Sequence, residues 1–179
     1  MKKLVTLWLL ICGAQLSAQT VTCDFQQTKF IAASGKTVQS NGSLTFDYAG
    51  KLDMRYNQPQ GDFFIIDGKT ISMNINGKKA TIDTEKNPRM KSYRNTLVNC
   101  ITGNWDLVCK ENDAESTVIE KNGMKIVEIN AKKISTRGYS KITLSYRKSD
   151  NMLVEMVLEE FNGIVTTYRM SNCKKTGKK

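Results

Sequence analysis

The chain has 179 residues, with 27 basic and 17 acidic side chains, no histidine and a formal net charge of +10. The lack of histidine excludes a Ser-His-Asp triad, a Cys-His pair and histidine-ligated zinc or iron sites. The basic residues are dispersed, which fits solubility or contact with anionic membranes better than the concentrated patch of a nucleic-acid site. No phosphate-binding loop or nucleophile motif is present. We therefore expect a protein that is not an enzyme and needs no cofactor or metal.

Residues 1–18 have the pattern of a cleavable signal peptide. Lys2 and Lys3 precede a short apolar run from Leu4 to Ile11, and Leu16-Ser17-Ala18 forms a cleavage site before Gln19. The run is too short to span a bilayer. We predict export, with a formal charge of +8 on the mature chain because cleavage removes two lysines from the +10 total.

The exported chain keeps four cysteines, at positions 23, 100, 109 and 173. In an exported protein this number suggests two disulfides, which three pairings would satisfy. We favour Cys100 with Cys109, which are close in sequence, and Cys23 with Cys173, which would join the two ends. No C-x-x-C motif is present, which argues against a thiol oxidoreductase.

Alternating apolar residues between Gly42 and Ile75 predict strands with one apolar and one wet face. A weaker strand is expected over residues 22–31, followed by a loop from Ala32 to Ser40. The apolar sets of the main stretch are Leu44/Phe46/Tyr48, Leu52/Met54/Tyr56 and Ile71/Met73/Ile75, with Phe64 and Ile66 on the same face as the last set.

Two-residue turns are expected at Asp67-Gly68 and Asn76-Gly77, because both central positions of such turns need a positive φ. The first turn predicts that Phe64 pairs with Ile71. The second predicts that Met73 pairs with Ala80, which keeps the apolar face continuous.

Three-residue loops are expected at Ala49-Gly50-Lys51 and around Asn162-Gly163. A two-residue turn at either place would put the apolar sets of the two strands on opposite faces. The longer loops instead predict that Phe46 pairs with Met54 and that Met156 pairs with Tyr168.

One amphipathic helix is predicted after residue 86. Asn87 is a capping residue, Pro88 suits the first helical position, and Gly103 is a stop signal. The helical spacing is carried by Met90, Tyr93, Leu97 and Ile101.

Strands are expected again from Trp105 to the end of the domain. Residues 135–138 read as a loop, and Asn122-Gly123 as a turn between residues 117–121 and 124–130. The alternating sets are Trp105/Leu107/Cys109, Ile142/Leu144/Tyr146, Met152/Val154/Met156/Leu158 and Ile164/Thr166/Tyr168/Met170.

About ten strands, each roughly 20 Å long and about 4.8 Å apart, make a sheet on the order of 50 Å by 20 Å. One helix of about 15 residues covers only around a quarter of that area. The sheet must therefore fold into a sandwich, close into a barrel, or curl into a half-barrel with a lid. Only the last two leave room for a ligand, and methionines on the apolar faces suit ligands of variable shape.

The order of several short motifs resembles that of the periplasmic outer-membrane lipoprotein carriers, the LolA family. The motifs are Phe25-Gln26-Gln27, Gly42-Ser43-Leu44, Gly50-Lys51-Leu52, Tyr56-x-x-Pro59, Ile65-Ile66-Asp67-Gly68-Lys69, Leu153-Val154-Glu155 and Phe161-Asn162-Gly163-x-Val165-Thr166-x-Tyr168. The resemblance covers most of the mature chain. Where better-studied members have an arginine that holds the lid closed, this chain has Asp47 and Tyr48.

The resemblance implies a mainly β protein with few helices: one strongly curved antiparallel sheet, an incomplete or half barrel, with a helical lid over a hydrophobic cavity. Residues 19–172 would form this single domain, and residues 173–179 a basic, disordered tail. It also implies a monomeric periplasmic carrier. Such a carrier takes the acyl chains of lipoproteins from an inner-membrane ABC-type exporter and delivers them to an outer-membrane acceptor.

Two other interpretations stay open. A protein of the same shape could sense lipids or lipoproteins without transferring them, and a structural β-sandwich would have a filled core. For the carrier, we expect Met90, Tyr93 and Leu97 on the lid. The expected cavity residues are Leu44, Phe46, Leu52, Met54, Tyr56, Phe64, Ile71, Met73, Leu144, Tyr146, Val154, Met156 and Tyr168.

Overall fold

The computed structural model describes residues 19–177, so the signal peptide predicted for residues 1–18 lies outside the described residues. The described residues form one antiparallel sheet of eleven strands in the order β6-β5-β4-β3-β2-β1-β11-β10-β9-β8-β7. The strands are β1 (Thr20–Ile31), β2 (Lys36–Asp47), β3 (Lys51–Gln58), β4 (Phe63–Asp67), β5 (Thr70–Ile75), β6 (Lys78–Asp83), β7 (Ala114–Lys121), β8 (Met124–Ala131), β9 (Tyr139–Arg147), β10 (Met152–Glu160) and β11 (Ile164–Thr176).

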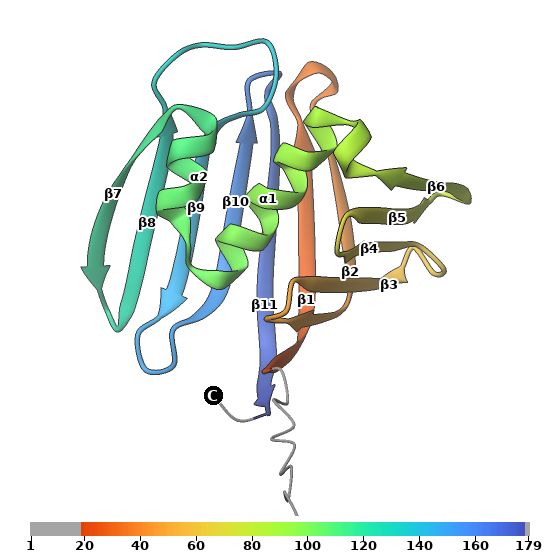
Figure 1. Cartoon of the computed structure of the whole chain (residues 1–179), viewed down its shortest axis with the longest axis horizontal. Helices are drawn as coiled ribbons and strands as arrows, with labels where there is room; N and C mark the ends of the chain where they lie inside the picture. The colour runs from red at the N-terminus through yellow and green to blue at the C-terminus, as the bar shows by residue number, and fades with distance from the viewer. Residues whose placement is uncertain (1–18, 178–179) are drawn as a thin grey trace, which may run out of the picture.

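The sheet is strongly curved and remains open, because its two edge strands β6 and β7 do not pair with each other. In Figure 1, β3 to β6 run across the direction of β7 to β11. The chain passes from β6 to β7 through a short 3-10 helix, η2 (Thr84–Lys86), then α1 (Pro88–Thr102) and α2 (Trp105–Asn112). Both α-helices lie over one face of the sheet (Figure 1). The predicted class, a curved antiparallel sheet with few helices, is confirmed.

Turn chemistry gave the correct register in the hairpins where asparagine and glycine both take a positive φ. Asn76 (φ 52°) and Gly77 (φ 77°) form a two-residue turn, and Met73 pairs with Ala80 as predicted. The predicted three-residue loop before Ile164 is also present, with Met156 opposite Tyr168.

Two other predicted registers are wrong by two residues. Phe64 pairs with Met73, because Gly68 and Lys69 are the turn residues. Phe46 pairs with Leu52, because the three-residue loop begins at Tyr48. A shift of two leaves every side chain on its predicted face, since the side-chain period of a strand is two.

Three predicted segments take a different form. Residues 36–40 extend β2, because they pair with the end of β1 up to Ile31–Lys36. Residues 173–176 continue β11 and pair with the start of β1, so this part of the predicted disordered tail is a strand. The predicted strand at Trp105 to Cys109 is the helix α2.

The prediction failed in α2 because the alternation of Trp105, Leu107 and Cys109 also fits a short helix. In the helix, Val108 is fully buried, whereas Leu107 is 48% exposed. A run of eight residues contains too few turns for its period to decide between helix and strand.

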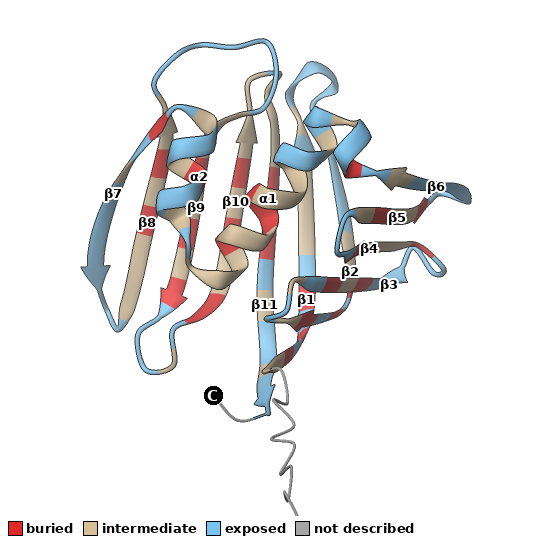
Figure 2. Ribbon diagram, in the orientation of Figure 1, coloured by how far each residue is buried: buried red, intermediate tan, exposed pale blue. Residues whose placement is uncertain are grey.

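The core lies between the helices and the concave side of the sheet. Buried residues occur on the inner side of α1 and on the strands behind it, whereas the outer edge strands are mostly exposed (Figure 2). Val108 of α2, Cys100 of α1 and Tyr146 of β9 are fully buried there. The Tyr146 hydroxyl donates a hydrogen bond to the Cys100 carbonyl, which fixes α1 over β9.

A disulfide joins Cys23 of β1 to Cys173 of β11, as predicted, across a sequence separation of 150. Cys100 and Cys109 are free thiols, so the predicted bond between them is wrong. They lie on different helices, α1 and α2, whereas the sequence predicted a helix around Cys100 and a strand at Cys109. Burial raises the pKa of the Cys100 thiol to about 12, so it stays protonated at neutral pH.

The thiol assignment can be checked by alkylation. The chain from Gln19, unfolded without reductant, should take up two iodoacetamide groups, at Cys100 and Cys109. After reduction it should take up four, and mass spectrometry of peptides should locate the added pair at Cys23 and Cys173. Uptake of no label before reduction would show that the helical cysteines are bonded after all.

We predict that the pairing of β2 with β3 requires glycine at position 42. The pairing of these strands is irregular between Asn41 and Gly42, and a Cβ on residue 42 would overlap the backbone carbonyl of Arg55. Gly42→Ala should lower the free energy of unfolding by about 1–3 kcal/mol, the usual cost of overpacking. Ser43→Ala, at the exposed neighbouring position, is the control, and equal denaturation midpoints for the two variants would contradict the prediction.

Candidate ligand-binding cavity

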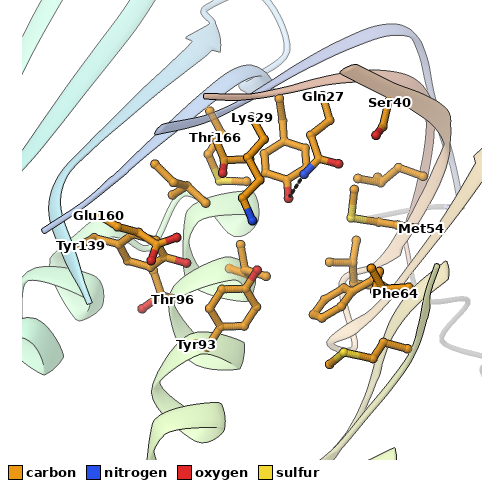
Figure 3. A pocket seen from close by; sticks show the side chains of 18 of the residues that line it. Gln27, Lys29, Ser40, Met54, Phe64, Tyr93, Thr96, Tyr139, Glu160 and Thr166 are labelled. Carbon is orange, nitrogen blue, oxygen red and sulfur yellow. Dashed lines mark hydrogen bonds between the residues drawn. The ribbon is translucent and has the colours of Figure 1, made fainter. Parts of the chain in front are cut away.

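A cavity of about 790 Å³ lies between the concave face of the sheet and α1. Its walls come from β1 to β5 and from β9 to β11, and α1 closes the opposite side (Figure 3). The volume is in the range of sites that hold small molecules, about 300–1,000 Å³. The sheet is too curved, and the two helices are too short, for protein side chains to fill the space between them.

Most of the predicted cavity residues do line this space. The sheet contributes Leu44, Leu52, Met54, Tyr56, Phe64, Met73, Met156 and Tyr168, and the helix contributes Met90, Tyr93 and Leu97. Met54 and Phe64 face α1 across the cavity (Figure 3). These residues lie on their predicted face and border the cavity.

Four predicted residues, Phe46, Ile71, Leu144 and Tyr146, do not line the cavity, because each is fully buried in the core. They lie on the expected face of the sheet, but other side chains cover them. Trp105 of α2, for example, lies 5.7 Å from the Tyr146 ring between centroids. The two-residue period of a strand predicts which face of the sheet a side chain lies on, but it does not predict which other side chains pack against it.

Val154 was placed on the wrong side. The pairing of β10 with β9 is irregular between Leu153 and Glu155, and Val154, in this bulge, does not line the cavity. It packs near Val21, Cys23 and Met152, in a small cluster beside the disulfide. Leu153 lines the cavity in its place. A bulge adds one residue to a strand and so reverses the alternation beyond it.

Helix α1 forms the lid as its sequence signals predict. The Asn87 side chain accepts a hydrogen bond from the Met90 backbone N–H, Pro88 occupies the first turn, and Gly103 ends the helix with φ 80°. Thr96 and Ile101 line the cavity beside the three predicted lid residues. The helical period of three to four residues places all of them on one side.

Arg94 fixes the first half of the lid to the sheet. Its guanidinium donates hydrogen bonds to the Thr84 hydroxyl and, at 3.3 Å, to the Gly68 carbonyl in the β4–β5 turn. Thr84 is fully buried and its hydroxyl donates to the Lys69 carbonyl at 2.7 Å. Arg94 therefore supplies, from the helix side, a lid contact that Asp47 and Tyr48 do not provide from the sheet.

The cavity also has polar residues that the sequence analysis did not select. Gln27, Lys29, Ser40 and Thr166 line it, and Figure 3 shows them on the sheet side of the cavity. Gln27 and Lys29 follow the buried Phe25 at intervals of two residues on β1, so the sequence could have predicted that they share its face. They were missed because only apolar residues were sought.

Four tyrosines surround the cavity with un-ionised hydroxyls. Burial raises the pKa of Tyr56 to about 12, and it raises the pKa values of Tyr93, Tyr139 and Tyr168 above the ordinary tyrosine value. At neutral pH these groups are hydrogen-bond donors and acceptors without charge. The wall is thus apolar over most of its area, with a few neutral and charged polar groups.

Within residues 19–177, no three cysteine, aspartate or glutamate side chains cluster closely enough to hold a metal ion. In the same residues, no helix has the length and hydropathy needed to cross a membrane. The described part of the chain therefore presents the cavity as its main candidate site.

The fold was compared with solved structures. The chain is similar to an outer membrane lipoprotein-sorting protein domain from Vibrio parahaemolyticus, with 10% identity, TM-score 0.43 and coverage of 88% of this chain and 85% of that one. It is similar to a LolA superfamily protein from Nitrosomonas europaea, with 7% identity, TM-score 0.38 and coverage of 87% and 85%. It is also similar to the Mycobacterium tuberculosis lipoprotein LppX, with 13% identity, TM-score 0.34 and coverage of 87% of this chain and 86% of that one.

No curated protein sequence matches the chain at a significant level. The family comparison is decisive, because residues 16–179 match the family described as outer membrane lipoprotein carrier protein LolA. The match extends over nearly the whole chain, including every strand and both helices that build the cavity. The chain belongs to the outer membrane lipoprotein carrier protein LolA family.

Proposed function

We propose that this protein binds the acyl chains of lipoproteins in the cavity under α1 and carries them through the periplasm from the inner to the outer membrane. The observation that carries the proposal is the cavity of about 790 Å³, whose walls are mainly leucine, methionine and aromatic side chains. A filled-core sandwich, the structural alternative, does not fit a single open sheet with such a space.

The hydrophobic effect explains why a carrier is needed. A sixteen-carbon chain exposed to water costs about 0.8 kcal/mol for each methylene, or on the order of 12 kcal/mol. A cavity that buries the chain offsets most of this cost. Because apolar contact has no fixed direction, the affinity follows the buried area, and the ligand can leave when a competing apolar environment is offered.

The composition of the walls suits a ligand that must be both held and released. Met54, Met73, Met90 and Met156 line the cavity on both the sheet and the lid. Their unbranched, flexible side chains adapt to ligands of different shape. The donor in this proposal is an inner-membrane ABC-type exporter and the acceptor is an outer-membrane protein.

Transfer between membranes separates a carrier from a sensor of the same fold. The chain from Gln19 would be loaded with a fluorescent diacylated peptide and mixed with inner-membrane vesicles, then with outer-membrane vesicles. A carrier moves the label from the first to the second in proportion to its concentration. A protein that binds the peptide and does not accelerate its transfer is the sensor, and the transport proposal then fails.

Charges placed on opposite walls should abolish binding of the acyl chain. Met73 on β5 and Met90 on α1 both line the cavity and are only partly buried, so Met73→Asp with Met90→Asp should fold. An ionised carboxylate in the apolar space must lose hydration when a chain enters. We expect at least a tenfold loss of affinity for a fluorescent fatty acid, measured by titration.

The matched control is Val118→Asp, which adds a carboxylate to the exposed edge strand β7, where Val118 is 49% exposed. It should bind like the unmodified chain. Equal affinity of the double variant and the control would place the binding site elsewhere.

Arg94→Met should loosen the lid and accelerate ligand exchange. The substitution removes hydrogen bonds to Thr84 and Gly68 that fasten α1. Hydrogen bonds from charged groups contribute about 1.5–3 kcal/mol, less where water has access, so we expect association and dissociation rates to rise about threefold to tenfold. Stopped-flow fluorescence measures both rates. The control is Lys110→Met, which removes the charge of an exposed lysine on α2. If Arg94→Met leaves both rates unchanged, Arg94 has no role in closing the lid.

A further inference from the structure

A block of polar side chains occupies the concave wall at the centre of the sheet. In the pairing of β1 with β11, Lys29 lies opposite Thr166, and Gln27 lies opposite Tyr168. Ser40 of β2 lies opposite Gln27 on its other side. All five side chains line the cavity. They form one continuous patch because residues two apart on a strand, and residues paired across strands, share a face.

The hydrogen bonds within the block leave donors directed at the cavity. The Gln27 side-chain amide donates to the Tyr168 hydroxyl at 3.2 Å. A phenol has one hydrogen to donate, and among the described residues the Tyr168 hydroxyl has no acceptor for it. The Thr166 side chain, only 8% exposed, likewise forms no hydrogen bond to residues 19–177.

Lys29 supplies a positive charge beside these donors. Its side chain extends into the cavity, and the ammonium nitrogen lies in the space between Tyr93 and Gln27 (Figure 3). Lys29 takes part in none of the ion pairs formed among residues 19–177. A half-buried ammonium group without a carboxylate partner is stabilised by a bound anion.

The acidic groups at the cavity do not meet this need. Both Asp62 oxygens accept from the Asn76 backbone N–H, at 2.9 and 3.0 Å. Glu160 accepts from the Asn162 side chain at 3.2 Å. The other charged residues in the wall, Arg89 and Arg137, are cations. Neither acid forms an ion pair with Lys29, and the three cations and two acids of the wall leave a formal balance of +1.

We propose that the cavity selects amphiphiles with an anionic headgroup, a carboxylate or a phosphate, whose oxygens contact Lys29, Thr166 and Tyr168. This inference goes beyond the proposed function, because it adds a second class of ligand, whose hydrocarbon tail would occupy the apolar part of the same cavity. The sequence of each strand supports this orientation. Next to the polar block, β1 continues to Phe25 and β2 to Leu44, and both are buried in the apolar core.

The test compares laurate, dodecyl phosphate and dodecanol, which share a twelve-carbon tail and differ only in the headgroup. Each displaces a neutral fluorescent probe from the chain that begins at Gln19, at pH 8. We expect both anions to bind at least about tenfold more tightly than dodecanol, the effect of one charge-assisted hydrogen bond. The anion that binds more tightly identifies the source, a fatty acid for laurate and a phospholipid for the phosphate.

Lys29→Met should remove the preference for anions and leave the affinity for dodecanol unchanged. Thr166→Val, which keeps the shape of the side chain, should weaken both anions by a smaller factor. Lys121→Met is the matched control, because Lys121 is an exposed lysine in the β7–β8 hairpin, and it should change nothing.

The results distinguish the two proposals from each other. If Lys29→Met weakens all three ligands equally, or none of them, the headgroup site is overturned and the acyl-chain cavity stands. If dodecanol and laurate both fail to displace the probe from the unmodified chain, the proposed function itself fails. Circular dichroism shows whether each variant is folded, and Thr166→Val keeps the question decidable if Lys29→Met does not fold.

Discussion

An eleven-stranded sheet with one apolar face and no partner sheet is the constraint on which this structure depends. That face must be removed from water, and the chain supplies only α1 and α2 to cover it. Curvature brings the two halves of the sheet toward the helices, but the side chains that meet there do not fill the centre. The cavity of about 790 Å³ is the space that remains. A hydrocarbon ligand would complete the burial that the protein itself leaves incomplete.

The position of the helices follows from the order of the strands. The segment from residue 84 to residue 113 connects the two edges of the sheet, β6 and β7, so it has to cross the concave side. It is held at two places, by Arg94 against the β4–β5 turn and by Tyr146 against the Cys100 carbonyl. Apolar contacts add to these, since the Tyr93 ring lies 6.0 Å from Phe64 and 6.4 Å from Tyr139 between centroids. The part of α1 that a ligand has to displace is therefore the part with the fewest polar contacts to the sheet.

The cavity wall has two chemical regions, and they suit different parts of one ligand. The outer strands and the lid contribute methionine, leucine and aromatic side chains, which bind a tail by area. The centre of the sheet, at β1 and β11, contributes Lys29, Thr166 and Tyr168, which in our proposal contact a headgroup by charge and hydrogen bonds. The disulfide between Cys23 and Cys173 joins these same two central strands. The polar residues of the wall and the disulfide thus lie on the same two neighbouring strands.

The sequence by itself determined the strand faces, the α1 caps and most hairpin turns, because these depend on residues close together in the chain. It placed Leu44, Met54 and Met73 on the cavity side. Tertiary structure alone decided that Phe46 and Tyr146 are covered, that a bulge takes Val154 out of the cavity wall, and that Trp105 to Asn112 is a helix. Which side chains remain uncovered depends on how elements far apart in sequence pack together, and a local period carries no information about that packing.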